Sequence, residues 1–183
     1  DGIWVNKQGD RFVNEQTLNP DQRERAFLNQ KDFGFYYIFD HQTRKTGPGI
    51  IGWDEKQIQD GISRGIVKQA NTVNVLARKI NVDATRLTAT IARFNQFVNA
   101  GVDTDYRRQK LTRTLSNQPF YSIPITGSIL ISHGGIAVNH LLQAVDANDT
   151  AIQGLFAVGE TLGSAQMMGT AVLSGMSVGP AIT

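Results

Sequence analysis

The chain has 183 residues, of which 40% are hydrophobic and 19% are charged, and its formal net charge is +2. These values are those of an ordinary globular protein with one large domain or two modest ones, and the scattered basic residues argue against nucleic acid as a partner. The absence of cysteine excludes disulfides and thiolate chemistry, and no apolar run is long enough to be a membrane segment.

The first part of the chain predicts short strands and one helix. Segments 3–5 and 11–13 flank the turn-forming letters NKQGD and predict a hairpin. Residues 20–31 favour a helix that Asn19 caps. The aromatic segment 33–40 predicts a strand.

The middle of the chain predicts helices. Residues 55–68 favour a short amphipathic helix or two turns, and residues 71–79 favour a second helix. A third helix is predicted to begin after Asp83, which caps it, and to end at Gly101. The apolar stripe of this helix consists of Leu87, Ile91, Phe94 and Val98.

The character of the sequence changes after a polar, basic stretch at 103–118. Segments 119–132, 134–139 and 154–159 are strand-like runs separated by Gly, Asn and Asp, and we therefore place a domain boundary near residue 118. The chain begins without methionine and ends in apolar residues typical of an unfinished helix, which predicts a piece of a longer protein.

The letters GPGIIG at 47–52 match the G-x-G-x-x-G pattern of dinucleotide-binding loops. Such a loop needs a strand directly before it and a helix directly after it. Here polar residues 41–46 follow the predicted strand, and no acid that could bind a ribose lies between Asp60 and Asp83. The segment is therefore predicted to be a loop without that function.

The histidines are His41, His133 and His140, and none has the spacing of a metal ligand, so no metal site is predicted. His133 precedes two glycines at a strand edge, where a backbone can approach a ligand closely. A turn histidine with a structural role fits the same pattern, so both alternatives stay open.

Glu160 ends the apolar run 154–159 and is followed by Gly163. A carboxylate in this place can accept hydrogen bonds from the hydroxyls of a ribose or ribityl chain, although a capping carboxylate at a strand end fits as well. The small residues of 174–183 predict a helix whose first amides can stabilise negative charge, such as the charge on a reduced flavin.

Several blocks, taken in order, resemble the C-terminal part of the fumarate reductase/succinate dehydrogenase flavoprotein family. This FAD-dependent group includes soluble fumarate reductases and ketosteroid dehydrogenases. The blocks are GIWVNKQGDRFVNE (2–15), ATIARFNQFVNAGVDTDYRR (89–108), PFYSI (119–123), GGIAVN (134–139), IQGLFAVGE (152–160) and SVGPAIT (177–183).

The resemblance implies an α+β fold of two parts. Residues 1–118 would form a capping domain that covers the substrate, and residues 119–183 would form the C-terminal strands and last helix of a Rossmann-like FAD-binding domain. The resemblance also implies FAD as the cofactor and a small molecule as the substrate. The partner would be the missing N-terminal FAD-binding half of the same chain.

The resemblance assigns cofactor-binding residues as well. Gly159 and Glu160 would bind the sugar chain of the flavin, and Ser177 and Val178 would present helix amides to its ring. Gly175 would lie where the ring meets the substrate.

The catalytic residues of the family do not have identical residues at the matching positions of this sequence. The arginine proton donor of fumarate reductases falls near Asn19, so the nearest candidates are Arg23 and Arg25. His133 is the alternative acid, because the pKa of a histidine suits neutral pH.

The family's substrate-binding histidine and arginine fall on Leu130 and Val172. Either the alignment of the family's positions with this sequence is off by a residue or two, or the substrate is not fumarate. We expect an FAD-dependent oxidoreductase that transfers hydride between flavin N5 and a C–C bond. The alternatives are the same fold acting on an apolar enone or steroid-like ring, and a non-enzymatic binding domain that has lost the flavin.

Overall fold

The computed structural model describes residues 2–17, 19–46, 53–127, 132 and 134–163. Contacts divide the chain into two compact units, Asp1–Gly127 and Ser128–Thr183. The first unit contains helices and strands and the second contains strands and a 3₁₀ turn, so the predicted mixture of helix and strand is confirmed. The GPGIIG segment lies outside the described residues.

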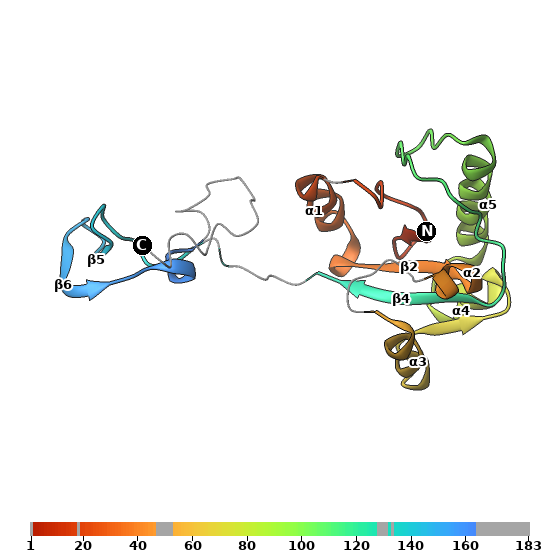
Figure 1. Cartoon of the computed structure of the whole chain (residues 1–183), viewed down its shortest axis with the longest axis horizontal. Helices are drawn as coiled ribbons and strands as arrows, with labels where there is room; N and C mark the ends of the chain where they lie inside the picture. The colour runs from red at the N-terminus through yellow and green to blue at the C-terminus, as the bar shows by residue number, and fades with distance from the viewer. Residues whose placement is uncertain (1, 18, 47–52, 128–131, 133, 164–183) are drawn as a thin grey trace. The chain divides into compact units, whose positions relative to one another are not determined.

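The first unit is built on a four-stranded antiparallel sheet with the order β1-β2-β4-β3 (Figure 1). Its central strands, β2 and β4, pair from Gly34 opposite Thr126 to Asp40 opposite Phe120. Both strands are rich in aromatic and β-branched residues, which pack well on a pleated surface. The strands are β1 Ile3–Val5, β2 Gly34–Asp40, β3 Lys68–Ala70 and β4 Phe120–Thr126.

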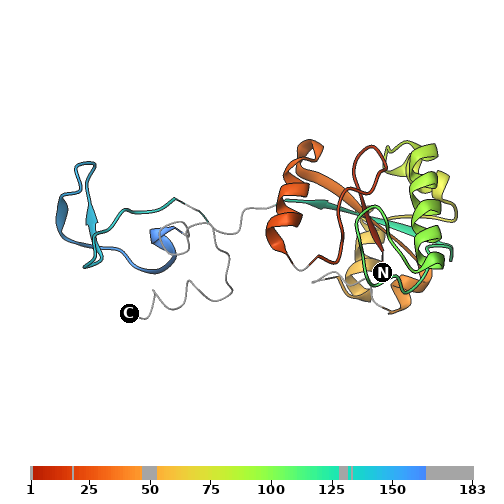
Figure 2. The same cartoon turned by 90° about the horizontal axis from the view of Figure 1, so that it is seen from above.

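Helices cover both faces of this sheet. Helices α4 and α5 pack on the face that carries Ile3 and Ile38, and α3 packs on the opposite face with Tyr37 and Ile123 (Figures 1 and 2). The two faces separate because side chains alternate along each strand. The helices are α1 Pro20–Leu28, η1 Lys31–Phe33, α2 His41–Thr46, α3 Glu55–Ser63, α4 Val73–Lys79 and α5 Ala84–Ala100.

The helix predicted between Asp83 and Gly101 is confirmed, because α5 begins directly after Asp83 and ends directly before Gly101. The Asp83 side chain accepts a hydrogen bond from the Arg86 N–H at 2.8 Å, and Gly101 ends the helix in the left-handed conformation. Val98 is only half-buried, whereas the neighbouring Phe97 is buried. The buried members of the predicted stripe are Leu87, Ile91 and Phe94.

The predicted hairpin of segments 3–5 and 11–13 is confirmed only in part, as one antiparallel bridge rather than two paired strands. Strand β1 pairs along its length with β2, and the returning chain contributes a single bridge, between Val5 and Arg11. An isolated two-stranded hairpin is only marginally stable. The long, buried strand β2 therefore offers β1 a better partner than a short return can.

The second unit contains a small hairpin of β5 Gln143–Val145 and β6 Ala151–Phe156. The Asp146 side chain closes its turn by accepting hydrogen bonds from the N–H groups of Asn148 and Thr150, both at 2.9 Å. These bonds lower the pKa of Asp146, because they stabilise the charged carboxylate.

Two assignments near this hairpin differ from the sequence-based expectation. Segment 134–139 contributes only one bridge, between Val138 and Ala144, because the chain turns at Asn139, whose side chain accepts the Leu141 N–H at 2.9 Å. Strand β4 pairs with β2 and β3 and so belongs to the first unit. The contacts therefore divide the two compact units after Gly127, and the boundary expected near residue 118 between a capping and an FAD-binding part stays a prediction.

Candidate functional site

The carboxylate singled out in the sequence, Glu160, lies in a tight turn after β6. This turn is η2, a 3₁₀ helix over Gly159–Leu162. Gly159 (φ 66°) and Gly163 (φ 74°) flank Glu160 in a backbone conformation that residues with a side chain rarely adopt. The Gly163 N–H donates to the Glu160 carbonyl at 2.9 Å, and Glu160 itself is exposed.

A second segment lies directly against this turn. The Ile136 N–H donates to the Thr161 carbonyl at 2.9 Å. A Cβ atom at Gly135 would collide with the backbone of Leu162 and Gly163, so only glycine fits there. The two segments therefore pack backbone against backbone within the turn that carries the exposed Glu160.

This arrangement fits the sugar chain of a flavin. A carboxylate accepts hydrogen bonds from hydroxyl groups, and Gly159 and Gly163, one at each end of the turn, have no side chain that could keep a ligand from the main chain. Two of the predicted cofactor residues, Gly159 and Glu160, which are consecutive in the sequence, both lie in η2. The residues that lie outside the described part of the chain are Leu130, His133, Val172, Gly175, Ser177 and Val178.

The other predicted residues, Arg23 and Arg25, lie on α1 in the first unit. Arg23 is half-buried and Arg25 is exposed. Asn19, near which the resemblance places the proton donor of the family, caps this helix. Its side-chain oxygen accepts a hydrogen bond from the Gln22 N–H at 3.3 Å, so this residue serves the start of α1.

A buried charge network in the first unit was not predicted from the sequence. The Arg11 Nε donates to Glu15 at 2.8 Å, and the Arg11 Nη2 donates to Asp103 at 2.9 Å. The charged residues of this network lie in the sequence blocks 2–15 and 89–108, so they were visible in the sequence. The sequence does not show, however, that their charges are buried. The network consists of four residues whose side chains are at most 5% exposed: Arg11, Glu15, Asp103 and Arg108.

Burial and pairing act in opposite directions on the pKa values of this network. Burial alone would lower the pKa of Arg11, but its hydrogen bonds and ion pairs with Glu15 and Asp103 outweigh this effect and raise it. Burial alone would raise the pKa of Asp103, but the hydrogen bond from Arg11 and bonds from backbone N–H groups lower it. At Arg108 burial dominates, and the pKa is lowered. Pairing thus keeps Arg11 and Asp103 charged at neutral pH.

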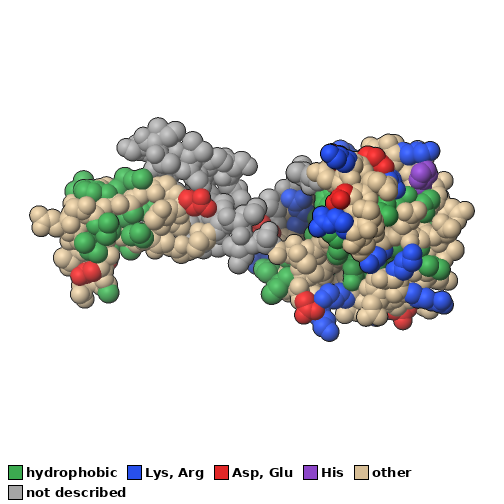
Figure 3. Space-filling model, turned by 90° about the horizontal axis from the view of Figure 1, so that it is seen from below, with side chains coloured by type: hydrophobic (Ala, Val, Ile, Leu, Met, Phe, Trp, Pro, Cys, Tyr) green, Lys and Arg blue, Asp and Glu red, His purple; other side chains and the backbone are tan. Residues whose placement is uncertain are grey.

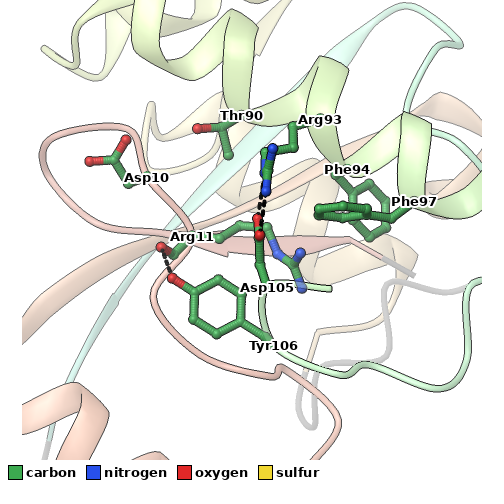
Figure 4. Close-up of a pocket in the computed structure, with 8 residues that line it drawn as sticks. All are labelled: Asp10, Arg11, Thr90, Arg93, Phe94, Phe97, Asp105 and Tyr106. Carbon is green, nitrogen blue, oxygen red and sulfur yellow. Dashed lines mark hydrogen bonds and ion pairs between the residues drawn. The ribbon is translucent and has the colours of Figure 1, made fainter. Parts of the chain in front are cut away.

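A cavity of about 220 Å³ adjoins the network (Figure 4). The Arg11 guanidinium lies between the rings of Phe94 and Tyr106, with its Cζ 5.3 and 5.1 Å from their centroids. The Tyr106 hydroxyl donates to the Arg11 carbonyl at 2.7 Å. Arg11 and Arg93 on the cavity wall are balanced by Asp10 and Asp105. The lining therefore has no charge preference that would favour an ionic ligand.

Two general findings apply to the described residues. None of the helices among them combines the length and apolar character that crossing a membrane requires. No group of three or more His, Asp or Glu side chains in this part of the chain could hold a metal ion.

Comparison with known proteins gives matches along nearly the whole chain. Residues 2–178 match the family model described as FAD binding domain. Fumarate reductase (cytochrome) from Shewanella frigidimarina is 32% identical over 181 residues, which cover 99% of this chain and 30% of that protein. The 3-oxosteroid 1-dehydrogenase of Mycobacterium tuberculosis is 32% identical over 212 residues, which cover 99% of this chain and 36% of that protein.

A solved structure matches as well. The open conformation of a flavocytochrome c3 fumarate reductase superposes with a TM-score of 0.75 at 27% identity, covering 99% of this chain and 30% of that chain. The chain therefore spans about a third of the length of these relatives.

Proposed function

Because the chain belongs to the FAD-binding-domain family, we propose that it is part of an FAD-dependent oxidoreductase of the fumarate reductase type. FAD is the cofactor of this family, in agreement with the cofactor expected from the sequence blocks. The observation that carries the proposal is the η2 turn, where the exposed Glu160 follows Gly159 and the backbone of Gly135 packs against Leu162 and Gly163. We assign the activity to the longer polypeptide of which this chain is a part.

Each unit has its own role in this proposal. The second unit is the C-terminal part of the FAD-binding domain, in which Gly159 and Glu160 hold the sugar chain. Gly175, Ser177 and Val178 hold the flavin ring. The first unit is the capping domain, which covers the substrate and excludes water from it.

When bound, FAD supplies hydride transfer between its N5 atom and a C–C bond of an activated substrate. The chain itself binds and orients the cofactor and holds the proton that the substrate exchanges. The candidate donors are Arg23, Arg25 and His133. Among them His133 has the most suitable chemistry, because a guanidinium gives up a proton only in a special environment.

The surface of the second unit supports the proposed partner. Large hydrophobic side chains on β6 and just after it are between 43% and 60% exposed (Figure 3), and exposed apolar patches mark contact surfaces. We assign this surface to the N-terminal FAD-binding half of the same polypeptide. The side chains are Ile152, Leu155, Phe156 and Val158.

A visible absorption spectrum of the polypeptide that contains this chain tests the proposal. We expect the absorption of bound FAD, which disappears on anaerobic reduction and returns when fumarate is added. If the purified protein shows no flavin even after FAD is supplied, the enzyme proposal fails. A binding domain without flavin is then the better account.

A second substrate class is favoured by one observation. In the correspondence drawn from the sequence blocks, Leu130 and Val172 fall on the positions at which the family binds a dicarboxylate, and burying a carboxylate against apolar residues is unfavourable. An uncharged enone or a steroid-like ring fits such positions better. If the flavin absorption of the reduced protein returns when an enone is added, but not when fumarate is added, the substrate belongs to this uncharged class.

A further inference from the structure

We propose that the buried network of Arg11, Glu15, Asp103 and Arg108 is a positioning device for helix α1. The inference rests on the proposed function, because α1 carries two of the candidate proton donors, Arg23 and Arg25. The network acts through the helix, so its members are positioning residues rather than catalytic ones.

Glu15 lies at the centre of the network. One of its oxygens accepts hydrogen bonds from the Trp4 N–H at 3.3 Å and from the Arg11 Nε at 2.8 Å. The other oxygen accepts from the Arg11 Nη2 at 2.9 Å and from the Arg108 Nη1 at 3.3 Å. One carboxylate thus joins β1, the loop before α1 and the segment that follows α5.

The residues on both sides of Glu15 carry this anchoring to the start of α1. The Asn14 side chain donates to the Arg107 carbonyl at 3.2 Å. The Gln16 side chain and the Lys110 backbone bond each other in both directions, at 3.4 and 3.2 Å. The hydroxyl of Thr17 then donates a hydrogen bond to the side-chain oxygen of Gln22 on α1, at 2.9 Å. Asn14, Gln16 and Thr17 thus connect the network to the helix.

The far end of α1 is held in a different way. The Phe27 ring packs edge-on against Phe35, with 5.6 Å between centroids, and it fills the space beside Gly127. Apolar contacts therefore fix the end of the helix, whereas the charge network fixes its beginning. Loosening the network should move the first turn of α1 more than the last.

Stability alone gives little reason to bury these charges. Taking two positive and two negative groups out of water costs free energy that their attraction offsets only when the geometry is good, and apolar residues of similar size can fill such space equally well. A buried network has one property that apolar packing lacks. Glu15 must meet donors from Trp4, Arg11 and Arg108 at once, so a single arrangement of the loop is favoured. Of the buried side-chain nitrogen and oxygen atoms of this network, all in the described part of the chain, only the Arg11 Nη1 has no hydrogen-bond partner.

The test compares Glu15→Gln with Asp10→Asn in the FAD-loaded polypeptide that contains this chain. Glu15→Gln keeps the size of the side chain and removes its charge. Asp10→Asn is the matched control, because Asp10 is also an acid near the start of the chain and pairs with Arg86 of α5, but at the surface. The measurements are hydrogen–deuterium exchange of residues 19–28, flavin content, and kcat and KM for the substrate that the wild type converts.

In Glu15→Gln we expect the amides of the first turn of α1 to exchange at least about tenfold faster, with β2 and β4 unchanged. With the donor on α1, at Arg23 or Arg25, we expect kcat to fall about tenfold or more and flavin content and KM to stay close to the wild type, because a misplaced donor slows proton transfer without weakening binding. Faster exchange with an unchanged kcat would overturn the link to proton transfer and leave His133 as the donor. Asp10→Asn should behave as the wild type in every measurement.

An equal rise of exchange across the whole first unit would show a purely structural role and overturn the proposal. If the amides of α1 exchange at the same rate in Glu15→Gln as in the wild type, the proposal is overturned as well. If the wild type binds FAD but converts neither fumarate nor an enone, the proposed function fails. The exchange of α1 then still decides whether the network positions the helix.

A second variant guards against misfolding of Glu15→Gln. Arg108→Lys keeps the charge but removes the fork whose Nη1 reaches both Glu15 and the Gly2 carbonyl, the latter at 2.7 Å. We expect the same pattern in this variant, with faster exchange at the start of α1 and a lower kcat. Unchanged exchange and kcat in Arg108→Lys would contradict the positioning role.

Discussion

Gly135 and Leu162 lie so close together that the backbone of Leu162 occupies the space where a side chain at position 135 would begin. The hydrogen bond from the Ile136 N–H to the Thr161 carbonyl fixes this contact. It joins the chain before β5 to the turn after β6, and this turn carries Glu160. The shape of the proposed flavin-binding turn therefore depends on residue 135 being glycine, which has no side chain.

Gly135→Ala should separate these two segments. We expect the melting temperature of the polypeptide that contains this chain to fall and bound FAD to be largely lost, since overpacking of this kind costs about 1–3 kcal/mol. Gly134→Ala is the matched control, because nothing lies within 4 Å of a Cβ atom at that position. Thermal unfolding and flavin content measure both effects, and equal behaviour of the two variants would contradict the close contact.

Glu160→Gln should weaken FAD binding. A hydrogen bond to a charged group contributes about 1.5–3 kcal/mol, so we expect the dissociation constant of FAD to rise about ten- to a hundredfold. Titration of the apoprotein with FAD measures the change. The control is Asp149→Asn, which removes a carboxylate from the β5–β6 turn of the same unit. An unchanged affinity in Glu160→Gln would remove this residue from the proposed site.

Asp40 should make the first unit sensitive to acid. Burial alone would raise the pKa of Asp40, but hydrogen bonds from the N–H groups of Thr43 and Asn117, both at 2.9 Å, outweigh it and lower the pKa. A carboxyl with a lowered pKa stabilises the fold above its ordinary value of about 4. This contribution is lost as the pH falls through the lower folded value.

Asp40→Asn should therefore reduce the free energy of unfolding by about 1–3 kcal/mol at neutral pH and flatten its fall in acid. Urea unfolding between pH 7 and about pH 2.5 measures both quantities. Asp60→Asn, a change of a surface acid, is the control and should follow the wild-type curve. A curve for Asp40→Asn that parallels the wild type in acid would contradict the assignment.

Leu87→Ala tests the core between α5 and the sheet. Leu87 is fully buried, and removing a buried leucine side chain leaves a cavity and costs about 3–5 kcal/mol. Val102, just after the helix, is 59% exposed, so Val102→Ala should change stability by less than about 0.5 kcal/mol. Chemical unfolding of both variants measures the difference, and a small loss in Leu87→Ala would mean that α5 packs elsewhere.

The sequence was a reliable guide to helix α5, whose structure depends on residues close together in the chain. The cap at Asp83, the end at Gly101 and the apolar spacing of α5 were all visible, because each depends on neighbours within a few residues. The ordered blocks also predicted the flavoprotein family and FAD, and the family model over residues 2–178 confirms both. The carboxylate of Glu160 stood out because it ends an apolar run.

Interactions between distant segments could not be read in this way. Strand β1 has an apparent partner at 11–13, yet it pairs with β2, because a long strand with a buried face gives more hydrogen bonds and burial. Arg11 and Asp103 are 92 residues apart in the sequence and meet at 2.9 Å in the buried network. Nothing in the order of the letters marks their charges as buried, because burial is created only when α5 and the segment after it pack against the start of the chain.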